Sequence, residues 1–170
     1  MEEEIVNRVA SSALVSIDLE EYYVVGERVL LDIREVLFQE MILREKDLRE
    51  FIRQHDWRQY QEKLVAVTCT ADAVIPTWAF MLLTIALRPH AKKIFYGDLA
   101  GLERELYAEK LAGVDWEQYR GKKVVIKGCS KHEVPVSAYV EASSRLQPLV
   151  VSMMYGEPCS TVPLYKQPKV

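Results

Sequence analysis

The sequence predicts an α/β fold, in which a largely parallel sheet is flanked by helices and is built from an internal duplication. Short runs rich in β-branched residues alternate with segments of a dozen or more residues that suit helices. Such alternation is typical of parallel sheets with helices on their faces. Two segments also repeat at a constant spacing. In sheets of this kind ligands bind at the carboxyl edge, so that edge is where we look for function.

The duplication has an offset of 59 residues (115 − 56). The segment Asp-Trp-Arg-Gln-Tyr at 56–60 reappears as Asp-Trp-Glu-Gln-Tyr at 115–119. The same offset carries Pro76 onto Pro135, Pro89 onto Pro148, and Tyr96-Gly97-Asp98 onto Tyr155-Gly156-Glu157. A repeat of this length is the signature of a duplicated structural unit. The two pseudo-repeats therefore cover about residues 44–98 and 103–157.

The N-terminal third is expected to add a strand at about Arg28–Leu31 and a long helix from about Arg34 to His55. Each pseudo-repeat then has the order helix, Asp-Trp-x-Gln-Tyr loop, strand, cysteine loop, helix, strand. Their β-branched content predicts strands at Leu64–Thr68, Ile94–Tyr96, Val124–Lys127 and Val150–Met154.

Two prolines mark the starts of the helices that follow the cysteine loops. Pro76 and Pro135 are expected in the first turn, where a missing N–H costs nothing. These helices should end near Leu87 and Leu146, because the residue before a proline avoids the helical region and Pro89 and Pro148 follow.

Composition excludes several classes of protein. With 170 residues, 49% hydrophobic and 28% charged, the chain fits one globular domain spanning 1–170. A formal net charge of −3 argues against a nucleic-acid partner, and no stretch approaches the roughly 20 apolar residues of a membrane span. The acidic start, Met1–Ile5, is unlike a secretory signal, so a cytoplasmic location is expected, with no membrane partner. A homodimer is the base-rate expectation for oligomeric state.

Each of the three cysteines lies at or near the end of a predicted strand. Cys69 follows the strand at 64–68, Cys129 follows the run 124–128, and Cys159 lies just beyond Glu157. The first two differ by 60 rather than 59, with Gly128 taking up the slip. An odd number of cysteines without an export signal favours metal or thiol chemistry over disulfides. A cysteine preceding a helix would also have its thiol pKa lowered by the helix dipole.

Three thiolates from separate loops suit zinc or an iron–sulfur cluster. We therefore predict a metal site formed by Cys69, Cys129 and Cys159. The fourth ligand would be Asp72, Asp98, His132 or Glu157. Lys127 and Lys131 would offset the negative charge of the thiolates. No two cysteines are spaced to chelate locally, so this prediction depends on the fold.

Other interpretations of the same residues stay open. The cysteines could be packing residues, since free cysteine is often buried as a small hydrophobe. Cys69 or Cys129 could instead be a persulfide, redox or acyl-carrying nucleophile, with His132 as base. A third interpretation is a partner-docking protein without a metal, which uses its acidic surface and the helix at 34–55. Trp57 and Trp116 are expected to staple the helix-to-strand turns. The sequence assigns no catalytic residue.

Several segments resemble an uncharacterised family of Bacteroidetes proteins known as a domain of unknown function. They are Glu4–Arg8, Leu19–Tyr23, Cys69 with Ile75-Pro76, Lys127–Lys131 and Tyr155–Pro163. The similarity extends over essentially the whole chain. Genes of this family often lie beside those of the sulfur-mobilisation system for iron–sulfur assembly. The resemblance therefore implies an accessory role in iron–sulfur cluster assembly, with iron–sulfur assembly proteins as partners, and it implies no catalytic residue.

Overall fold

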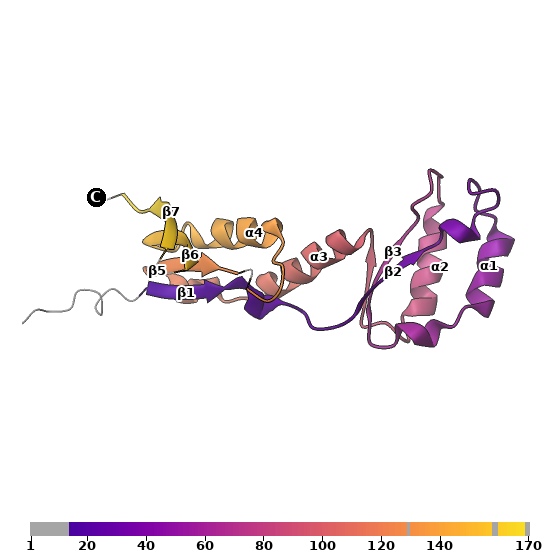
Figure 1. The fold of residues 1–170 in the computed structure, drawn as a ribbon, viewed down its shortest axis with the longest axis horizontal. Helices are drawn as coiled ribbons and strands as arrows, with labels where there is room; N and C mark the ends of the chain where they lie inside the picture. The colour runs from indigo at the N-terminus through magenta and orange to yellow at the C-terminus, as the bar shows by residue number, and fades with distance from the viewer. Residues whose placement is uncertain (1–13, 129, 158–159, 169–170) are drawn as a thin grey trace, which may run out of the picture. The chain divides into compact units, whose positions relative to one another are not determined.

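A computed structural model describes residues 14–128, 130–157 and 160–168. The protein is α/β, with helices packed on largely parallel strands, which confirms the predicted fold class (Figure 1). The strands form two sheets rather than one. The chain divides into two compact units. Unit 1 comprises Met1–Val24 and Leu106–Val170, and unit 2 comprises Val25–Glu105.

Unit 2 contains a three-stranded parallel sheet in the order β2-β3-β4. Its strands are β2 (Arg28–Asp32), β3 (Leu64–Thr68) and β4 (Lys93–Tyr96), and its helices are α1 (Glu45–Gln54) and α2 (Thr77–Leu87). Short 3-10 turns lie at Arg34–Val36 and Trp57–Tyr60. Val65 and Val67 of β3 share a buried core with Leu48 of α1 and Leu83 of α2, so both helices cover the same face of the sheet.

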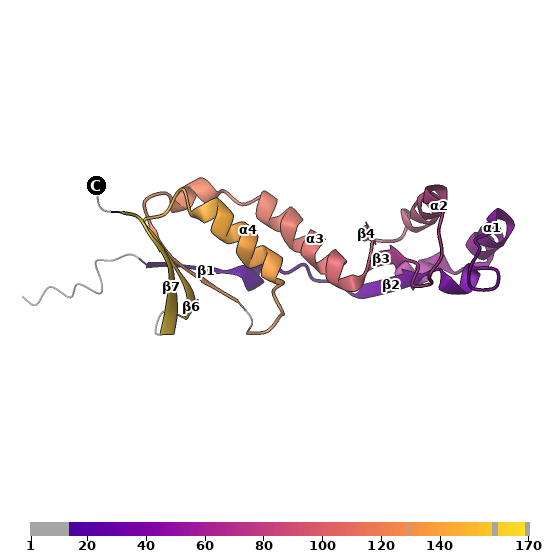
Figure 2. The same cartoon turned by 90° about the horizontal axis from the view of Figure 1, so that it is seen from above.

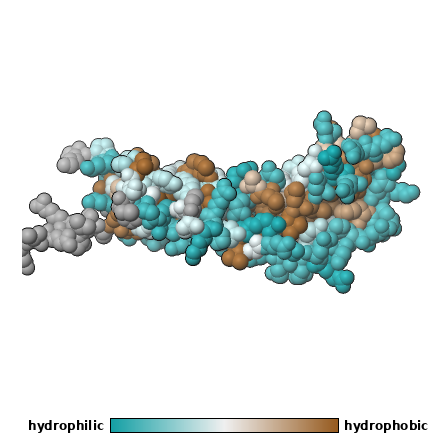
Figure 3. Space-filling view, viewed as in Figure 1, coloured by the Kyte–Doolittle hydropathy of each residue, from teal (hydrophilic) through white to brown (hydrophobic). Residues whose placement is uncertain are grey.

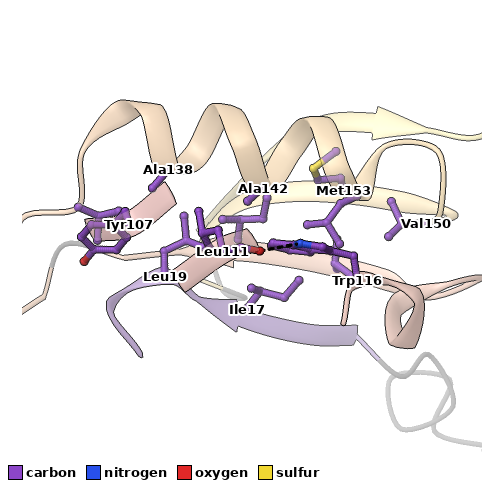
Figure 4. Close-up of a cluster of buried hydrophobic side chains, with 13 residues drawn as sticks. Ile17, Leu19, Tyr107, Leu111, Trp116, Ala138, Ala142, Val150 and Met153 are labelled. Atoms are coloured by element: carbon purple, nitrogen blue, oxygen red, sulfur yellow. Dashed lines mark hydrogen bonds between the residues drawn. The ribbon is translucent and has the colours of Figure 1, made fainter. Parts of the chain in front are cut away.

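Unit 1 contains a four-stranded sheet in the order β1-β5-β6-β7. The strands β1 (Leu14–Asp18), β5 (Lys123–Lys127) and β6 (Ser152–Glu157) are parallel, and β7 (Ser160–Lys166) is antiparallel to β6. Further 3-10 turns lie at Leu19–Tyr22 and Trp116–Tyr119. Helix α4 (Val136–Leu146) and the second half of α3 (Leu99–Ala112), from Leu106 on, lie on one side of this sheet, as Figure 2 shows. Figure 4 shows the core between them, with Trp116, Leu111, Ala142 and Met153 in contact across the layers.

The elements recur at the predicted offset. Adding 59 carries β3 onto β5, α2 onto α4, and the 3-10 turn at 57–60 onto the turn at 116–119. The tryptophans repeat their hydrogen bonds as well: Trp57 Nε1 donates to Ile52 O at 2.8 Å, and Trp116 Nε1 donates to Leu111 O at 3.1 Å. The shared motif therefore fixes the turn between helix and strand in both halves, and the expected stapling role is confirmed.

The helix predicted from Arg34 to His55 is wrong over its first half. α1 starts at Glu45, and the preceding residues form a tight loop closed by a bridge between Phe38 and Ile42. Leu37 and Leu43 are both buried in the core of unit 2. A right-handed helix has negative φ at every residue, so it cannot continue through a segment with positive φ. The chain instead turns back through Gln39 and Glu40, which have φ of 52° and 57°.

Three smaller expectations also change. The sequence pattern does not anticipate β1, or β7, which contains Pro163 and pairs with β6 across a register shift at Met153/Met154. Pro76 and Pro135 lie at the N-cap positions, immediately before α2 and α4, rather than inside the first turn. Both helices end at the predicted residues, Leu87 and Leu146.

None of the helices in the described part of the chain combines the length and apolar character needed to cross a bilayer.

The tryptophan contacts predict unequal stability effects in the two halves. Trp116 is 7% exposed, whereas Trp57 is only half-buried. Trp116→Phe should lower the free energy of unfolding by about 1–3 kcal/mol, because it removes a buried hydrogen bond and leaves a void. Trp57→Phe should cost less. Urea denaturation followed by circular dichroism measures both, and a larger effect at Trp57 would contradict this view of the core.

Candidate functional site

In unit 2, the carboxylate of Asp32 holds the loop that contains Cys69. Asp32 is the last residue of β2, and its Oδ1 accepts hydrogen bonds from the backbone N of Arg34 at 3.0 Å and of Thr70 at 3.1 Å. Its Oδ2 accepts from the Thr70 hydroxyl at 2.5 Å. Burial would raise the pKa of Asp32, but the hydrogen bonds from Thr70 and Arg34 outweigh it and hold that pKa below its usual value.

In unit 1, Glu20 holds the corresponding loop after β5. Its carboxylate accepts hydrogen bonds from the backbone N and the hydroxyl of Ser130, and from the backbone N of Lys131. Desolvation would raise the pKa of Glu20, yet these hydrogen bonds lower it. In both units, therefore, an acidic residue braces the loop that follows the neighbouring parallel strand: Asp32 is the last residue of β2, and Glu20 lies in the 3-10 turn just after β1.

Cys69 itself is half-buried and packs against the core of unit 2. It directly follows β3, as the sequence predicts. It does not lie at the N-terminus of α2, because that helix starts only at Thr77. The expected contact between this thiol and the helix dipole is therefore wrong. Its packing resembles that of a small apolar residue.

The one-residue slip between Cys69 and Cys129 has a structural reason. The residue that aligns with Cys69 is Gly128, and a Cβ at Gly128 would lie 2.5 Å from the Tyr139 hydroxyl. The residue aligned with Tyr139 in the first repeat is Phe80, which has no hydroxyl group. The second repeat thus has no room for a cysteine where the first repeat has one.

The predicted metal ligands fall in different parts of the chain. Cys69 belongs to unit 2, and positions 129 and 159 fall within the chain limits of unit 1. Cys129 and Cys159 lie outside the described residues. Within 14–128, 130–157 and 160–168, no group of three or more His, Cys, Asp or Glu side chains is placed to hold a metal. The three-cysteine centre therefore stays a prediction.

The candidate fourth ligands have other contacts. Asp98 Oδ1 accepts from the backbone N of Gly101 at 2.6 Å and so caps the start of α3. His132 stacks on the ring of Tyr23, with centroids 3.8 Å apart. Glu157 lies 4.0 Å from the ammonium of Lys127, and Asp72 is exposed. Lys127 also pairs with Asp18 at 3.5 Å, so its charge is directed at carboxylates.

A different feature stands out on the surface of unit 2. Helix α2 has almost no polar side: Ala79, Leu83 and Leu87 are buried, yet Trp78, Met81 and Ile85 are exposed. Met81 and Ile85 are 61% and 68% exposed. In Figure 3 the apolar colour gathers over the part of the surface where Figure 1 places α2. A helix that is apolar all round is normally covered on every side. We call Trp78, Met81, Leu82 and Ile85 the apolar α2 face.

The duplicate helix shows that the fold does not need this face. The same offset places Ser137, Val140, Glu141 and Ser144 of α4 at the positions of Trp78, Met81, Leu82 and Ile85. The buried positions, in contrast, are apolar in both helices. This difference is not among the features predicted above, although its signal is in the sequence: Thr77–Leu87 has only two threonines as polar residues, and its counterpart at 136–146 is far more polar.

Two grooves adjoin the apolar α2 face. One, of about 460 Å³, lies between α1 and α2 and is lined by Lys46, Arg49, Ile52, Arg53, Leu82, Ile85 and Ala86. The other, of about 600 Å³, lies beside β4 and is lined by Ile75, Thr77, Phe80, Met81, Thr84, Ile85 and Tyr96. Ile85 borders both grooves, so the apolar face joins them into one surface.

Comparison with known proteins places the chain in a family without assigning an activity. Residues 3–167 match the family described as "Protein of unknown function (DUF2480)", so the chain belongs to that family over nearly its full length. No curated protein and no solved structure matches it. Function must therefore be argued from the residues themselves.

The Asp32 brace predicts a pH dependence of stability. Because the folded pKa of Asp32 lies below its ordinary value of 3.8, its contribution is present above that pH and is lost as the pH falls through the folded pKa. Asp32→Asn should lower the melting temperature near neutral pH, and the gap to wild type should close in strong acid. Thermal melts between about pH 7 and pH 2.5 measure this. Asp72→Asn is the control, and a gap that stays constant with pH would contradict the brace.

Proposed function

We propose that this protein is an interaction protein that docks a partner on the apolar α2 face. The proposal rests on the exposed Trp78 and Ile85 of α2, which lie where its duplicate, α4, has Ser137 and Ser144; the half-buried Leu82 beside them is matched by Glu141. Contiguous exposed apolar surface marks interaction sites on soluble domains. Burying side chains such as Met81 and Ile85 would contribute roughly 1–2 kcal/mol each to binding.

The partner class follows from the family resemblance. That resemblance implies a Bacteroidetes family with genes near the sulfur-mobilisation system, so we propose iron–sulfur assembly proteins in the cytoplasm as the partners. The docking surface we favour differs from the one expected from sequence, which was the acidic surface and the helix at 34–55. That helix covers only Glu45–Gln54, and its neighbour α2 carries the apolar residues.

A second proposal keeps the three cysteines as ligands of zinc or an iron–sulfur cluster. Its support is the bracing of two cysteine loops: Asp32 holds the backbone beside Cys69, and Glu20 holds the backbone at Ser130 and Lys131, next to position 129. Fixed loops at the carboxyl ends of parallel strands are where ligands bind in such sheets. If one thiol instead acts alone as a persulfide or redox group, His132 is the candidate base.

The docking proposal predicts a loss of partner binding in Ile85→Glu. The matched control is Ser144→Glu, which puts the same charge at the duplicate position on α4. Tagged chains produced at native level should recover the same partner for wild type and Ser144→Glu but not for Ile85→Glu, and the purified pair should re-form the complex. Identical partners for all three chains would overturn the proposal. Circular dichroism checks that the variants are folded.

The metal proposal predicts stoichiometric zinc, or iron with sulfide, in protein purified without oxygen and without an affinity tag. Single replacements by serine at Cys69, Cys129 and Cys159 should each abolish the bound metal, because thiolates of one centre act together. Elemental analysis and the visible absorption spectrum are the measurements. Loss of persulfide or redox chemistry in one variant alone would indicate a lone reactive thiol. Metal-free wild type would refute the shared centre.

A further inference from the structure

Basic and acidic side chains of α1 line two different pockets, although Arg49 and Arg53 also ion-pair with Glu45 and Glu50 of the same helix. Lys46, Arg49 and Arg53 line the groove next to the apolar α2 face. Asp47 and Glu50 instead line a second pocket, together with Asp32 and Glu35. The groove between α1 and α2 therefore has a basic rim and an apolar floor, although the chain as a whole has a net charge of −3.

The rim charges are available to a partner. Arg49 Nε lies 2.8 Å from Glu45 Oε1, and Arg53 pairs with Glu50, but each of the four side chains is about half or more exposed to solvent. Exposed pairs of this kind contribute only about 0–1 kcal/mol, so a partner carboxylate can replace or join them at little cost. Lys46 forms no ion pair within the described part of the chain.

We infer that this groove binds an amphipathic helix whose apolar stripe is flanked by acidic residues. The inference rests on the proposed docking function and names its partner's chemistry. Ile52, Leu82, Ile85 and Ala86 form the floor for the apolar stripe. From Lys46 to Arg53 the rim follows α1 for about 10 Å, at roughly 1.5 Å per residue, which matches two turns of a docked helix. Helix-in-groove recognition uses apolar anchors at i, i+3 or i+4, and i+7.

The second pseudo-repeat has neither the basic rim nor the apolar floor. At the rim positions, Lys46, Arg49 and Arg53 are replaced by Glu105, Ala108 and Ala112. On the floor, Leu82 and Ile85 are replaced by Glu141 and Ser144. Because the elements themselves recur at this offset, the fold tolerates either set. The basic rim and the apolar floor thus belong to one surface that only the first repeat carries.

Charge also favours an acidic helix over a second copy of the chain. A two-fold contact places the same patch on both subunits at one interface. Two copies meeting through this groove would bring two basic rims together, and like charges at an interface are unfavourable. An acidic helix avoids this repulsion and brings carboxylates to Lys46, Arg49 and Arg53.

The test uses two labelled synthetic peptides of about 18 residues, long enough to form helix, with the same leucine stripe. One carries Glu beside the stripe, the other Lys. Fluorescence anisotropy with the full chain should show the Glu peptide binding at least tenfold more tightly than the Lys peptide, and the affinity should fall as salt rises. Lys46→Glu and Arg53→Glu should each weaken binding severalfold, Ile85→Glu should abolish it, and Ser144→Glu should leave it unchanged.

The outcomes separate this inference from the docking proposal. Equal binding of the two peptides, or unchanged binding by Lys46→Glu and by the milder Lys46→Gln, overturns the acidic helix. A dimer in analytical ultracentrifugation that Ile85→Glu dissociates also overturns it, because a second copy then occupies the face. Each of these results overturns only the acidic helix as the partner, and the proposal that α2 docks some partner still stands. If Ile85→Glu recovers its partner as wild type does, both the docking proposal and the acidic-helix inference are overturned.

Discussion

The parallel pairing of an early strand with the first strand of each repeat is the constraint on which the structure depends. Each repeat supplies two parallel strands, and the N-terminal third supplies the third: β1 pairs with β5, and β2 pairs with β3. The pairing is closed at the carboxyl edge by a carboxylate, from Glu20 in one unit and Asp32 in the other, which accepts hydrogen bonds from the next loop. These hydrogen bonds tie Thr70 in one unit to the last residue of the neighbouring parallel strand, and Ser130 in the other to the turn that follows that strand.

The duplication provides an internal reference for deciding which residues the fold requires. Both copies keep the tryptophan staple, the buried residues of the helix after the cysteine loop, and an aromatic pair between that helix and the next strand. The pair is Phe80 with Tyr96 in one copy and Tyr139 with Tyr155 in the other, both edge to face. At the buried positions of that helix the copies differ only by exchange of one apolar residue for another, Leu83 for Ala142, whereas on the surface they differ in polarity and charge. The apolar α2 face and the basic rim of α1 are such surface differences, and the proposed function is based on them.

The described part of the structure supports the predicted three-cysteine metal site less than the sequence pattern does. The two repeats do not place a cysteine at equivalent positions, because the hydroxyl of Tyr139 fills the space that a side chain at Gly128 would need. Asp98 caps a helix, Glu157 lies near Lys127 and His132 stacks on Tyr23. Each has a role that does not depend on a metal. The cysteine proposal therefore depends on Cys129 and Cys159, which lie outside the described residues.

The sequence by itself determined the features that local patterns control. The offset of 59, the strand at Leu64–Thr68 and the ends of α2 and α4 follow from β-branched runs and proline positions, whose effects act within a few residues. Only the tertiary structure decided the break before Glu45, where the chain turns through the positive φ of Gln39 and Glu40 and packs Leu37 and Leu43 on either side of that turn into one core. It also decided which side of α2 is exposed. A helix whose only polar residues are two threonines has too weak a pattern to distinguish its sides, so the layer it packs against determines which residues face solvent.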